Sequence, residues 1–525
     1  MNINLKNKYY LLLPVFFSFI LALIITLSNN FPLSWDIYTH ISYSLAYLHD
    51  GFTNVDYLLN APEGKTIGYP PFFHLILIIT SIITRLNLVD SARVLQILLT
   101  VCNVFTVTFV ASKIKDEKVG LFAGLLLISS FMFTRLLLPI PETLAMIFFT
   151  LTVYCYYKAS TEARVTYSIL AAILSLLSLA THFSSFIYLM ILLFVLMFVQ
   201  LILLKSFDAV EYYVYIIIPI FLLGLLTLVV LFVISPSYLS HILAGIVSIV
   251  ENPFDLFMGQ IAMGLERYIK CVGLIPLIFA IIGLYYSYKN KEFLFVSIWA
   301  LIAFIITNLH WFGIPVYTFR LLLYLIIPMV MLGGYAVSNI FEMLESQNNK
   351  SSIIFVILII ILSLGSGFMN INDSSVNNYS STSELSTYHI APPTSDEVEV
   401  INWFKNEDVG NKSVLTNNLF FGTVLSSIDE IPLHYSFDVY TNKSLSKSSS
   451  ESLNEEQIGY IVYDKSLTMQ NTSDYQSLSV RFVNGSYYPS YYFTKEITDD
   501  NFNTIKLQSS ETVFENGRFI ICKII

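Results

Sequence analysis

Charged residues are scarce in this chain: Asp, Glu, Lys and Arg make up 12% of its 525 residues, whereas 55% are hydrophobic. The mean hydropathy is +0.67, well above what a water-soluble domain keeps in solution. The sequence also lacks a phosphate-binding loop, a dinucleotide or haem motif and a basic patch for nucleic acid. We therefore expect a polytopic membrane protein without a nucleic-acid partner.

Cysteine is scarce as well. Cys102, Cys155 and Cys271 fall in apolar segments, and Cys522 stands alone near the end of the chain. This spacing excludes a CxxC motif, a cysteine zinc cluster and a disulfide within one domain. We expect all four residues to behave as small core hydrophobes.

Long apolar segments fill the first 369 residues. The first, residues 9–27, follows Lys6 and Lys8, is long for a signal peptide and lacks a small-residue cleavage site, so it predicts an uncleaved anchor. Further apolar segments predict helices near residues 69–84, 92–112, 119–134, 142–157, 166–180, 183–204, 212–234, 271–288, 293–309, 318–340 and 351–369.

The positions of the basic residues favour eleven membrane spans with a cytoplasmic N-terminus. If residues 69–84 do not span, the compact basic clusters all lie on one side, with Arg85 and Arg93 outside; these clusters are Lys6/Lys8, Lys113/Lys115/Lys118, Lys158/Arg164, Lys205, Lys289/Lys291 and Lys350. Residues 69–84 then form an interfacial or re-entrant helix within a long first external loop, residues 28–91. A second external loop, residues 235–270, predicts short interfacial helices.

The acidity of the chain belongs to its C-terminal part, where residues 370–525 hold 20 Asp and Glu against 10 Lys and Arg. We predict three parts: a transmembrane module over residues 1–369, a polar linker over residues 370–394, and an external soluble α/β domain over residues 395–525. In that domain, residues 395–406 predict a capped amphipathic helix, and residues 412–416, 458–463 and 518–524 predict strands.

Asp36 is the first candidate functional residue, because it is a lone acid at the outer end of the first apolar segment. Tyr38, His40, Tyr43 and Tyr47 follow it at helical spacing, beside an apolar stripe, which predicts a helix lying on the membrane surface. The alternative is an ordinary interfacial helix in which Asp36 is only the N-terminal cap.

Other polar residues stand at predicted external helix ends. Glu142 begins a helix behind a proline, seven residues after Arg135, and His182 lies at a helix junction. Arg320 enters an apolar run, where arginine is costly unless it is paired, snorkels or faces an anion. Its fork of donors suits a lipid phosphate, and a salt bridge to Glu142 or Asp36 is the alternative.

In order and loop placement these motifs resemble the GT-C superfamily of membrane glycosyltransferases, which use sugars linked to polyprenyl phosphate. The matching segments are residues 35–40 (WDIYTH), 68–74 (GYPPFFH), 135–142 (RLLLPIPE) and 320–328 (RLLLYLIIP). The resemblance implies an all-α polytopic membrane bundle and inverting transfer of a hexose or pentose from a polyprenyl (dolichyl) phosphate donor. The acceptor would be a glycan, lipid or protein at the external face of a cell-envelope membrane.

The resemblance also implies roles for individual residues. Asp36 would deprotonate or position the acceptor, and Arg320 would hold the donor phosphate. Glu142 would be a second catalytic acid that positions the acceptor or ligates a divalent metal, the one cofactor the resemblance admits. The remaining expected substrate-binding residues are His40, Tyr69, His74, Arg135 and His182.

The resemblance favours transfer of a monosaccharide over transfer of a whole oligosaccharide. Oligosaccharyltransferases of this superfamily carry a Trp-Trp-Asp signature in the external domain, whereas Trp403 is the single tryptophan of this tail. Two alternatives to an enzyme stay open: a transporter or flippase for a lipid-linked or anionic substrate, and a non-catalytic membrane scaffold. Inverted repeats would favour the transporter, and none is visible in the sequence.

Overall fold

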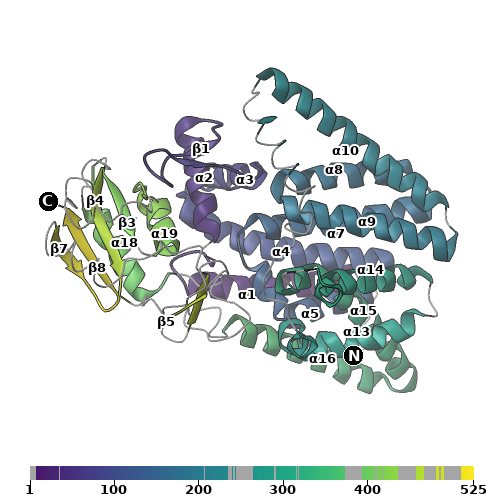
Figure 1. The fold of residues 1–525 in the computed structure, drawn as a ribbon. Helices are drawn as coiled ribbons and strands as arrows, with labels where there is room; N and C mark the ends of the chain where they lie inside the picture. The colour runs from purple at the N-terminus through teal and green to yellow at the C-terminus, as the bar shows by residue number, and fades with distance from the viewer. Residues whose placement is uncertain are drawn as a thin grey trace.

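The structure is a computed structural model in which a helical bundle carries a small sheet domain at one end (Figure 1). It describes residues 8–34, 36–205, 207–234, 239, 240, 243, 247, 264–288, 291–314, 316, 318–372, 393–407, 409, 410, 412–416, 418–434, 457–465, 480–483, 486–489 and 510–524. Most of the predicted linker, residues 370–394, and most of the second external loop, residues 235–270, for which short interfacial helices were predicted, lie outside this set.

The bundle begins with a 3-10 turn, Lys8–Leu11, and α1, Leu12–Leu27. The first loop then contains α2 (Asp36–Asp50), an antiparallel pair formed by β1 (Val55–Asp56) and β2 (Lys65–Thr66), and α3 (Phe72–Thr84). The helix predicted after Asp36 is therefore present. With 13 residues, α3 is about 20 Å long, shorter than a hydrocarbon layer of about 30 Å, which favours an interfacial or re-entrant position.

The remaining bundle helices follow the predicted apolar segments closely. They are α4 (Leu88–Ile114), α5 (Glu117–Ser129), α6 (Met132–Leu136), α7 (Pro141–Glu162), α8 (Val165–Thr181), α9 (Phe183–Leu204), α10 (Phe207–Ile234), α12 (Tyr268–Val272), α13 (Leu274–Ser287), α14 (Lys291–Thr307), α15 (Thr318–Gln347) and α16 (Asn349–Ile371), with 3-10 turns at Leu265–Arg267 and Leu309–Phe312.

Two of the predicted segments are not single helices. Residues 119–134 divide into α5 and α6 because the chain is extended at Ser130. Residues 271–288 break at Gly273, whose φ of 92° is unfavourable for any residue with a side chain, so α13 and the helices before it meet at 109°.

Among the described residues, six helices are long and apolar enough to cross a membrane, or seven if the bent pair at Gly273 forms one span. The count of eleven spans and the orientation of the chain in the membrane therefore stay predictions. The six helices are the first helix (residues 9–27), α4, α9, α10, α15 and α16.

α15 is the central helix of the bundle, since the whole apolar part of it is buried. It contacts α5 closely at Gly334, where an added Cβ would lie 2.6 Å from the carbonyl oxygen of Val119. By contrast, only 6% of the apolar window of α10 is buried, and this helix lies at the edge of the bundle in Figure 1. The apolar surface of α10 is therefore suited to contact with lipid.

The C-terminal sheet has the strand order β3-β4-β8-β7. Its strands are β3 (Ser413–Thr416), β4 (Ile458–Asp464), β7 (Ser510–Glu515) and β8 (Phe519–Ile524); β3 and β4 are parallel and the other pairs antiparallel. Three of these strands and the helix α18 (Ser395–Asn406) confirm the predicted elements. The helix α19 (Leu419–Asp429), the strand β7 and a hairpin of β5 (Val480–Val483) and β6 (Ser486–Pro489) were not predicted.

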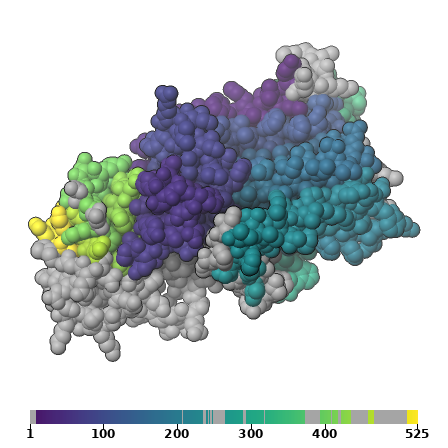
Figure 2. All heavy atoms as spheres, turned by 90° about the horizontal axis from the view of Figure 1, so that it is seen from above, coloured from purple at the N-terminus to yellow at the C-terminus, as the bar shows by residue number. Residues whose placement is uncertain are grey.

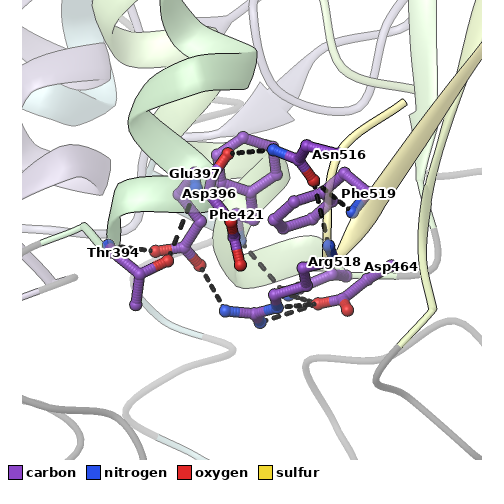
Figure 3. Close-up of polar contacts among 9 residues, drawn as sticks. Thr394, Asp396, Glu397, Phe421, Asp464, Asn516, Arg518 and Phe519 are labelled. Carbon is purple, nitrogen blue, oxygen red and sulfur yellow. Dashed lines mark hydrogen bonds and ion pairs between the residues drawn. The ribbon is translucent and has the colours of Figure 1, made fainter. Parts of the chain in front are cut away.

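A buried ionic network holds α18 to the sheet (Figure 3). Arg518 donates two hydrogen bonds to one carboxylate oxygen of Asp464, at 3.0 and 2.7 Å, and its guanidinium also lies 3.4 Å from Glu397. Glu397 in turn completes a capping box with Thr394 at the start of α18. The side chain of Asp464 is fully buried and that of Glu397 nearly so, so this network stabilises the domain only while all its members remain.

The C-terminal domain docks on the first loop. The backbone of Leu433 forms parallel bridges with both Leu59 and Val414, and Ser426 of α19 donates a hydrogen bond to the carbonyl of Leu58 at 3.1 Å. Figure 2 shows the purple and blue residues of the first part of the chain beside the green residues of this domain. Asp36 and the C-terminal domain are thus at the same end of the bundle.

Candidate functional site

Asp36 is the first residue of α2 and follows a tight turn. Ser34 adopts a φ of 80°, and its hydroxyl accepts a hydrogen bond from the Asp36 N–H at 3.2 Å. The Asp36 side chain is half-buried, and no hydrogen bond or ion pair joins its carboxylate to another described residue. Among the described residues, the Ser34 hydroxyl therefore accepts the first N–H of α2, and the Asp36 carboxylate caps no N–H of the helix.

The charges around Asp36 come from three different parts of the bundle. Arg320 acts on it most strongly, followed by Arg135 and Glu142. Burial raises the pKa of Asp36, and the two arginines oppose this rise. The carboxylate thus lies in a partly desolvated position between cationic groups, an environment in which it can accept a proton.

Arg135 and Glu142 form a buried ion pair at the junction of α6 and α7. An Arg135 Nη donates to a Glu142 carboxylate oxygen, and both side chains are about 95% shielded from solvent. Glu142 is in the first turn of α7, behind Pro141, where the helix dipole favours an acid. The Arg135 guanidinium also lies 5.8 Å from the ring of Phe319, which connects the pair to the start of α15.

Arg320 lies in the first turn of α15, one residue after Phe319, and its side chain is exposed. Its charge acts on Asp36, Tyr69, Glu142 and His182. The sequence left open a salt bridge from Arg320 to Glu142 or Asp36; the ion pair of Glu142 that the structure shows is with Arg135. Arg320 is therefore the exposed arginine of this group and Arg135 the buried one.

His40, one helical turn after Asp36 in α2, is in contact with His74. His40 Nδ1 lies 3.0 Å from His74 Nε2, and both rings are buried. Burial and the neighbouring His74 ring hold the pKa of His40 well below its ordinary value, so the pair is neutral, with one ring donating and the other accepting. Aromatic rings surround the pair, among them Tyr69, whose centroid is 4.8 Å from that of His40 and 6.4 Å from that of His74.

Tyr69 connects this pair to the charged groups. Its ring also lies 6.0 Å from that of His182, and the charges of Asp36, Arg320 and Glu142 act on its hydroxyl. Burial raises the pKa of Tyr69, so the phenol remains a hydrogen-bond donor at neutral pH.

His182 joins α8 to α9 and caps the second of these helices. Its Nδ1 accepts a hydrogen bond from the Ser185 N–H at 3.2 Å, and the Ser185 hydroxyl, 2.6 Å from Nδ1, lies 2.7 Å from the hydroxyl of Tyr324. Ser185 and Tyr324 were not among the residues predicted from the sequence. Two spacings point to them: Ser185 is three residues after His182, as in a capping motif, and Tyr324 is one helical turn after Arg320.

The structure therefore brings all eight predicted site residues together at one end of the bundle. They come from α2, the segment before α3, α3 itself, α6, α7, the α8–α9 junction and α15: Asp36, His40, Tyr69, His74, Arg135, Glu142, His182 and Arg320. Segments that are far apart in the sequence thus build a single polar cluster in an apolar bundle.

A divalent metal does not fit the groups that the structure describes. Within those residues no three His, Cys, Asp or Glu side chains are placed to hold one ion. Glu142, the acid considered as a ligand, uses one oxygen for Arg135, and His40 and His74 use a ring nitrogen each for one another. We therefore derive no reaction step through a metal.

The sequence matches no protein-family model and no curated protein, but solved structures share its fold. ArnT from Cupriavidus metallidurans bound to undecaprenyl phosphate aligns with a TM-score of 0.60 and 10% identity over 98% of each chain. AglB from Archaeoglobus fulgidus, an archaeal oligosaccharyltransferase in complex with an inhibitory peptide and a dolichol-phosphate, aligns with a TM-score of 0.57 and 13% identity over 87% of this chain and 69% of that chain.

The mycobacterial arabinofuranosyltransferase AftD aligns with a TM-score of 0.53 and 11% identity over 99% of this chain but 40% of its own. All three neighbours are GT-C glycosyltransferases. At identities this low the shared property is the fold. The chain therefore shares its fold with these three glycosyltransferases.

Proposed function

We propose that this protein transfers a single sugar from a polyprenyl phosphate donor to an acceptor at the external face of the membrane. The observation that carries the proposal is a half-buried acid, Asp36, and an exposed arginine, Arg320, whose charge acts on it, at one end of a GT-C bundle. Structural neighbours bound to undecaprenyl phosphate and dolichol-phosphate support a lipid donor of this class.

In the proposed reaction Asp36 is the general base. Its carboxylate removes the proton of an acceptor hydroxyl while the acceptor oxygen attacks the anomeric carbon of the sugar. The bond between that carbon and the phosphate oxygen breaks, and polyprenyl phosphate leaves with the bonding electrons. Because attack and departure occur on opposite faces, the anomeric configuration inverts. A pKa raised by burial makes the carboxylate a stronger base than an exposed aspartate.

Arg320 is proposed to bind the departing phosphate. Its exposed guanidinium offers two parallel donors to phosphate oxygens and stabilises the charge that develops there. Arg135 is buried against Glu142, and its positive charge also acts on Asp36. Glu142 has its second carboxylate oxygen available to orient the acceptor hydroxyl.

The aromatic and imidazole groups are proposed to form the sugar-binding side of the site. Tyr69 lies against His40, His74 and His182 and can present both a ring face and a phenol hydroxyl to a pyranose or furanose. The neutral His40–His74 pair adds hydrogen-bonding nitrogens without charge. The C-terminal domain, docked on the first loop, is proposed to help position the acceptor.

The test is transfer of labelled sugar from a polyprenyl phosphate donor pool to endogenous acceptors in membranes. Asp36→Asn removes the base and should lower transfer at least about 100-fold, the usual scale for a general base. Asp50→Asn is the matched control, because Asp50 is the exposed last residue of the same helix. Equal labelling by wild type and Asp36→Asn would contradict the proposal. Movement of the lipid-linked substrate across the membrane without transfer would favour a flippase.

A further inference from the structure

One edge of the His182 ring contacts a buried chain of two hydroxyl groups: that of Ser185, which touches the ring, and that of Tyr324, which touches Ser185. Ser185 Oγ lies 2.6 Å from His182 Nδ1, and Tyr324 Oη lies 2.7 Å from Ser185 Oγ. All three side chains are at least 90% buried. The two hydrogen bonds connect the α8–α9 junction to α15, the helix that also contains Arg320.

The hydrogen bonds determine where the imidazole carries its proton. The backbone N–H of Ser185 can only donate, and it donates to Nδ1 at 3.2 Å. Nδ1 must therefore present its lone pair, so neutral His182 is protonated at Nε2. With Nδ1 unprotonated, the Ser185 hydroxyl is also a donor toward it, and the Tyr324 hydroxyl is then a donor toward Ser185. The chain of donors runs from Tyr324 through Ser185 to His182 and strengthens along its length.

The opposite edge of the ring belongs to the candidate site. The charges of Glu142, Arg320 and Arg135 act on His182, and the Tyr69 ring lies 6.0 Å from it. The Nε2–H is on the side of the imidazole away from Ser185, so it is the polar group of His182 that remains for a ligand. Arg320 and Arg135 together outweigh the single negative charge of Glu142 in number, so the net charge acting on this N–H is positive and favours an anionic oxygen.

We propose that Ser185 and Tyr324 are positioning residues that hold His182 as a fixed, neutral Nε2–H donor to a phosphate oxygen of the lipid-linked donor. The phosphate ligand in this proposal rests on the function proposed above. The orientation of the ring does not, because it follows from the hydrogen bonds alone. It assigns His182 no proton transfer. Protonation would place a second proton on Nδ1, directly against the Ser185 N–H, and would remove the cap of α9.

Tyr324 is well placed for this task because its own ring is fixed. It stacks on Tyr188 with centroids 4.4 Å apart and meets Phe149 edge-on at 5.1 Å. Tyr324 is also four residues after Arg320, on the same face of α15. One helix therefore sets both the arginine and the orientation of the histidine, so the two phosphate donors keep a constant spacing.

The test compares Ser185→Ala and Tyr324→Phe with Tyr188→Phe, each in the full chain in detergent. Tyr188 is the matched control because its buried hydroxyl has no hydrogen-bond partner among the described groups, and the variant keeps the stacked ring. The first measurement is the ¹⁵N NMR spectrum of labelled histidine, with His182→Gln used to assign the signal. We expect a neutral ring protonated at Nε2 in wild type and in Tyr188→Phe.

The second measurement is binding of undecaprenyl phosphate. Loss of one hydrogen bond in the chain should weaken binding about fivefold to tenfold in Ser185→Ala and Tyr324→Phe, with less than a twofold change in Tyr188→Phe. Ser185→Thr keeps the hydroxyl and should restore most of the affinity, which separates positioning from a loss of folding.

The outcomes distinguish this inference from the proposed function. A proton on Nδ1 of wild-type His182 would overturn the positioning role of Ser185 and Tyr324. Wild-type affinity in Ser185→Ala and Tyr324→Phe would do the same, even if the enzyme transfers sugar. If wild type shows the Nε2–H signal but binds no polyprenyl phosphate, the phosphate assignment fails together with the proposed function and the orientation of the ring stands.

Discussion

The N–H of Leu433 donates a hydrogen bond of 2.7 Å to the carbonyl oxygen of Leu58, and the carbonyl of Leu433 accepts one of 2.9 Å from Ala61. These bonds join the C-terminal domain to the loop between α2 and α3. Ser426 adds a third bond, also to the carbonyl of Leu58. The helix that begins with Asp36 is therefore held between the bundle and a domain from the other end of the sequence.

Ser426→Ala should loosen this junction. The variant removes one buried hydrogen bond, worth about 1 kcal/mol, so the amides of Ala61 and Leu433 should exchange their hydrogens about fivefold faster. Ser427→Ala is the control, because the Ser427 hydroxyl bonds to Val424 within its own helix. Hydrogen exchange measured by mass spectrometry reports the difference, and equal rates in both variants would show that the side-chain bond does not hold the domain.

Removal of one partner of the Arg135–Glu142 pair should be more costly than removal of both. Arg135→Met leaves the Glu142 carboxylate buried and unpaired, which costs about 3–5 kcal/mol. The double variant Arg135→Met/Glu142→Met should recover most of the thermal stability while transfer activity remains low. Thermal unfolding in detergent compares both variants with wild type, and an unchanged melting temperature in Arg135→Met would argue against a buried pair.

Arg320→Gln should weaken binding of undecaprenyl phosphate without lowering stability. Arg320 is exposed in the first turn of α15, so the substitution removes little buried surface from the bundle. Loss of a charge-assisted, bidentate contact of about 1.5–3 kcal/mol corresponds to roughly 10- to 150-fold in affinity. Arg85→Gln, at the exposed end of α3, controls for general loss of positive charge and should bind as wild type does.

Arg518→Met should unfold the C-terminal domain. It leaves two buried carboxylates, Asp464 and Glu397, without their cation, and we expect a loss of about 3–5 kcal/mol. Lys523→Met, in the strand β8 that follows Arg518, is the matched control: it removes an exposed ion pair to Glu407 and should have little effect. Protease resistance of residues 393–524 distinguishes the two, and similar resistance in both variants would contradict a structural role for the buried network.

Asp429 should make the stability of this domain depend on pH. Burial raises its pKa to about 7, and neither carboxylate oxygen has a hydrogen-bond partner among the described residues. An unfolded aspartate titrates near 4, so the folded state binds the extra proton between about pH 4 and 7 and loses stability as the pH rises through that window. Asp429→Asn should therefore raise the melting temperature most at pH 8 and least at pH 4.

The control for that experiment is Glu430→Gln, which changes the exposed neighbour. This variant should alter the melting temperature little at pH 8. A pH profile of Asp429→Asn parallel to that of wild type would mean that Asp429 does not carry the dependence.

Local patterns were sufficient to predict α2, α18 and three strands of the C-terminal sheet, because a cap, a hydrophobic period or a run of β-branched residues is contained in each segment. The same patterns did not predict β7, whose sequence SETVFE is polar at the sheet edge. They also gave one helix for residues 271–288, although Gly273 and Pro276 mark the break. Glycine and proline at these positions indicate a break in the helix more strongly than the apolar length of the segment indicates one continuous helix.

The candidate site was predictable as a set of residues but not as a set of pairs. Asp36, Glu142 and Arg320 each stand out because polar groups are expensive in an apolar segment. Which arginine pairs with Glu142 depends on the packing of α6 against α7 and α15, which no local pattern encodes. Ser185 and Tyr324 escaped notice because hydroxyl groups are common in membrane helices, and only their distance from His182 distinguishes them.

The bridge between Leu59 and Leu433 also has a consequence for biogenesis. Leu59 emerges early in translation, whereas its partner is added only after every bundle helix has been synthesised. During that interval the loop between α2 and α3 lacks the backbone contact with Leu433. The end of the bundle that holds the candidate site thus acquires its contacts with Leu433 last, so a truncated or unfinished copy inserted in the membrane would lack them.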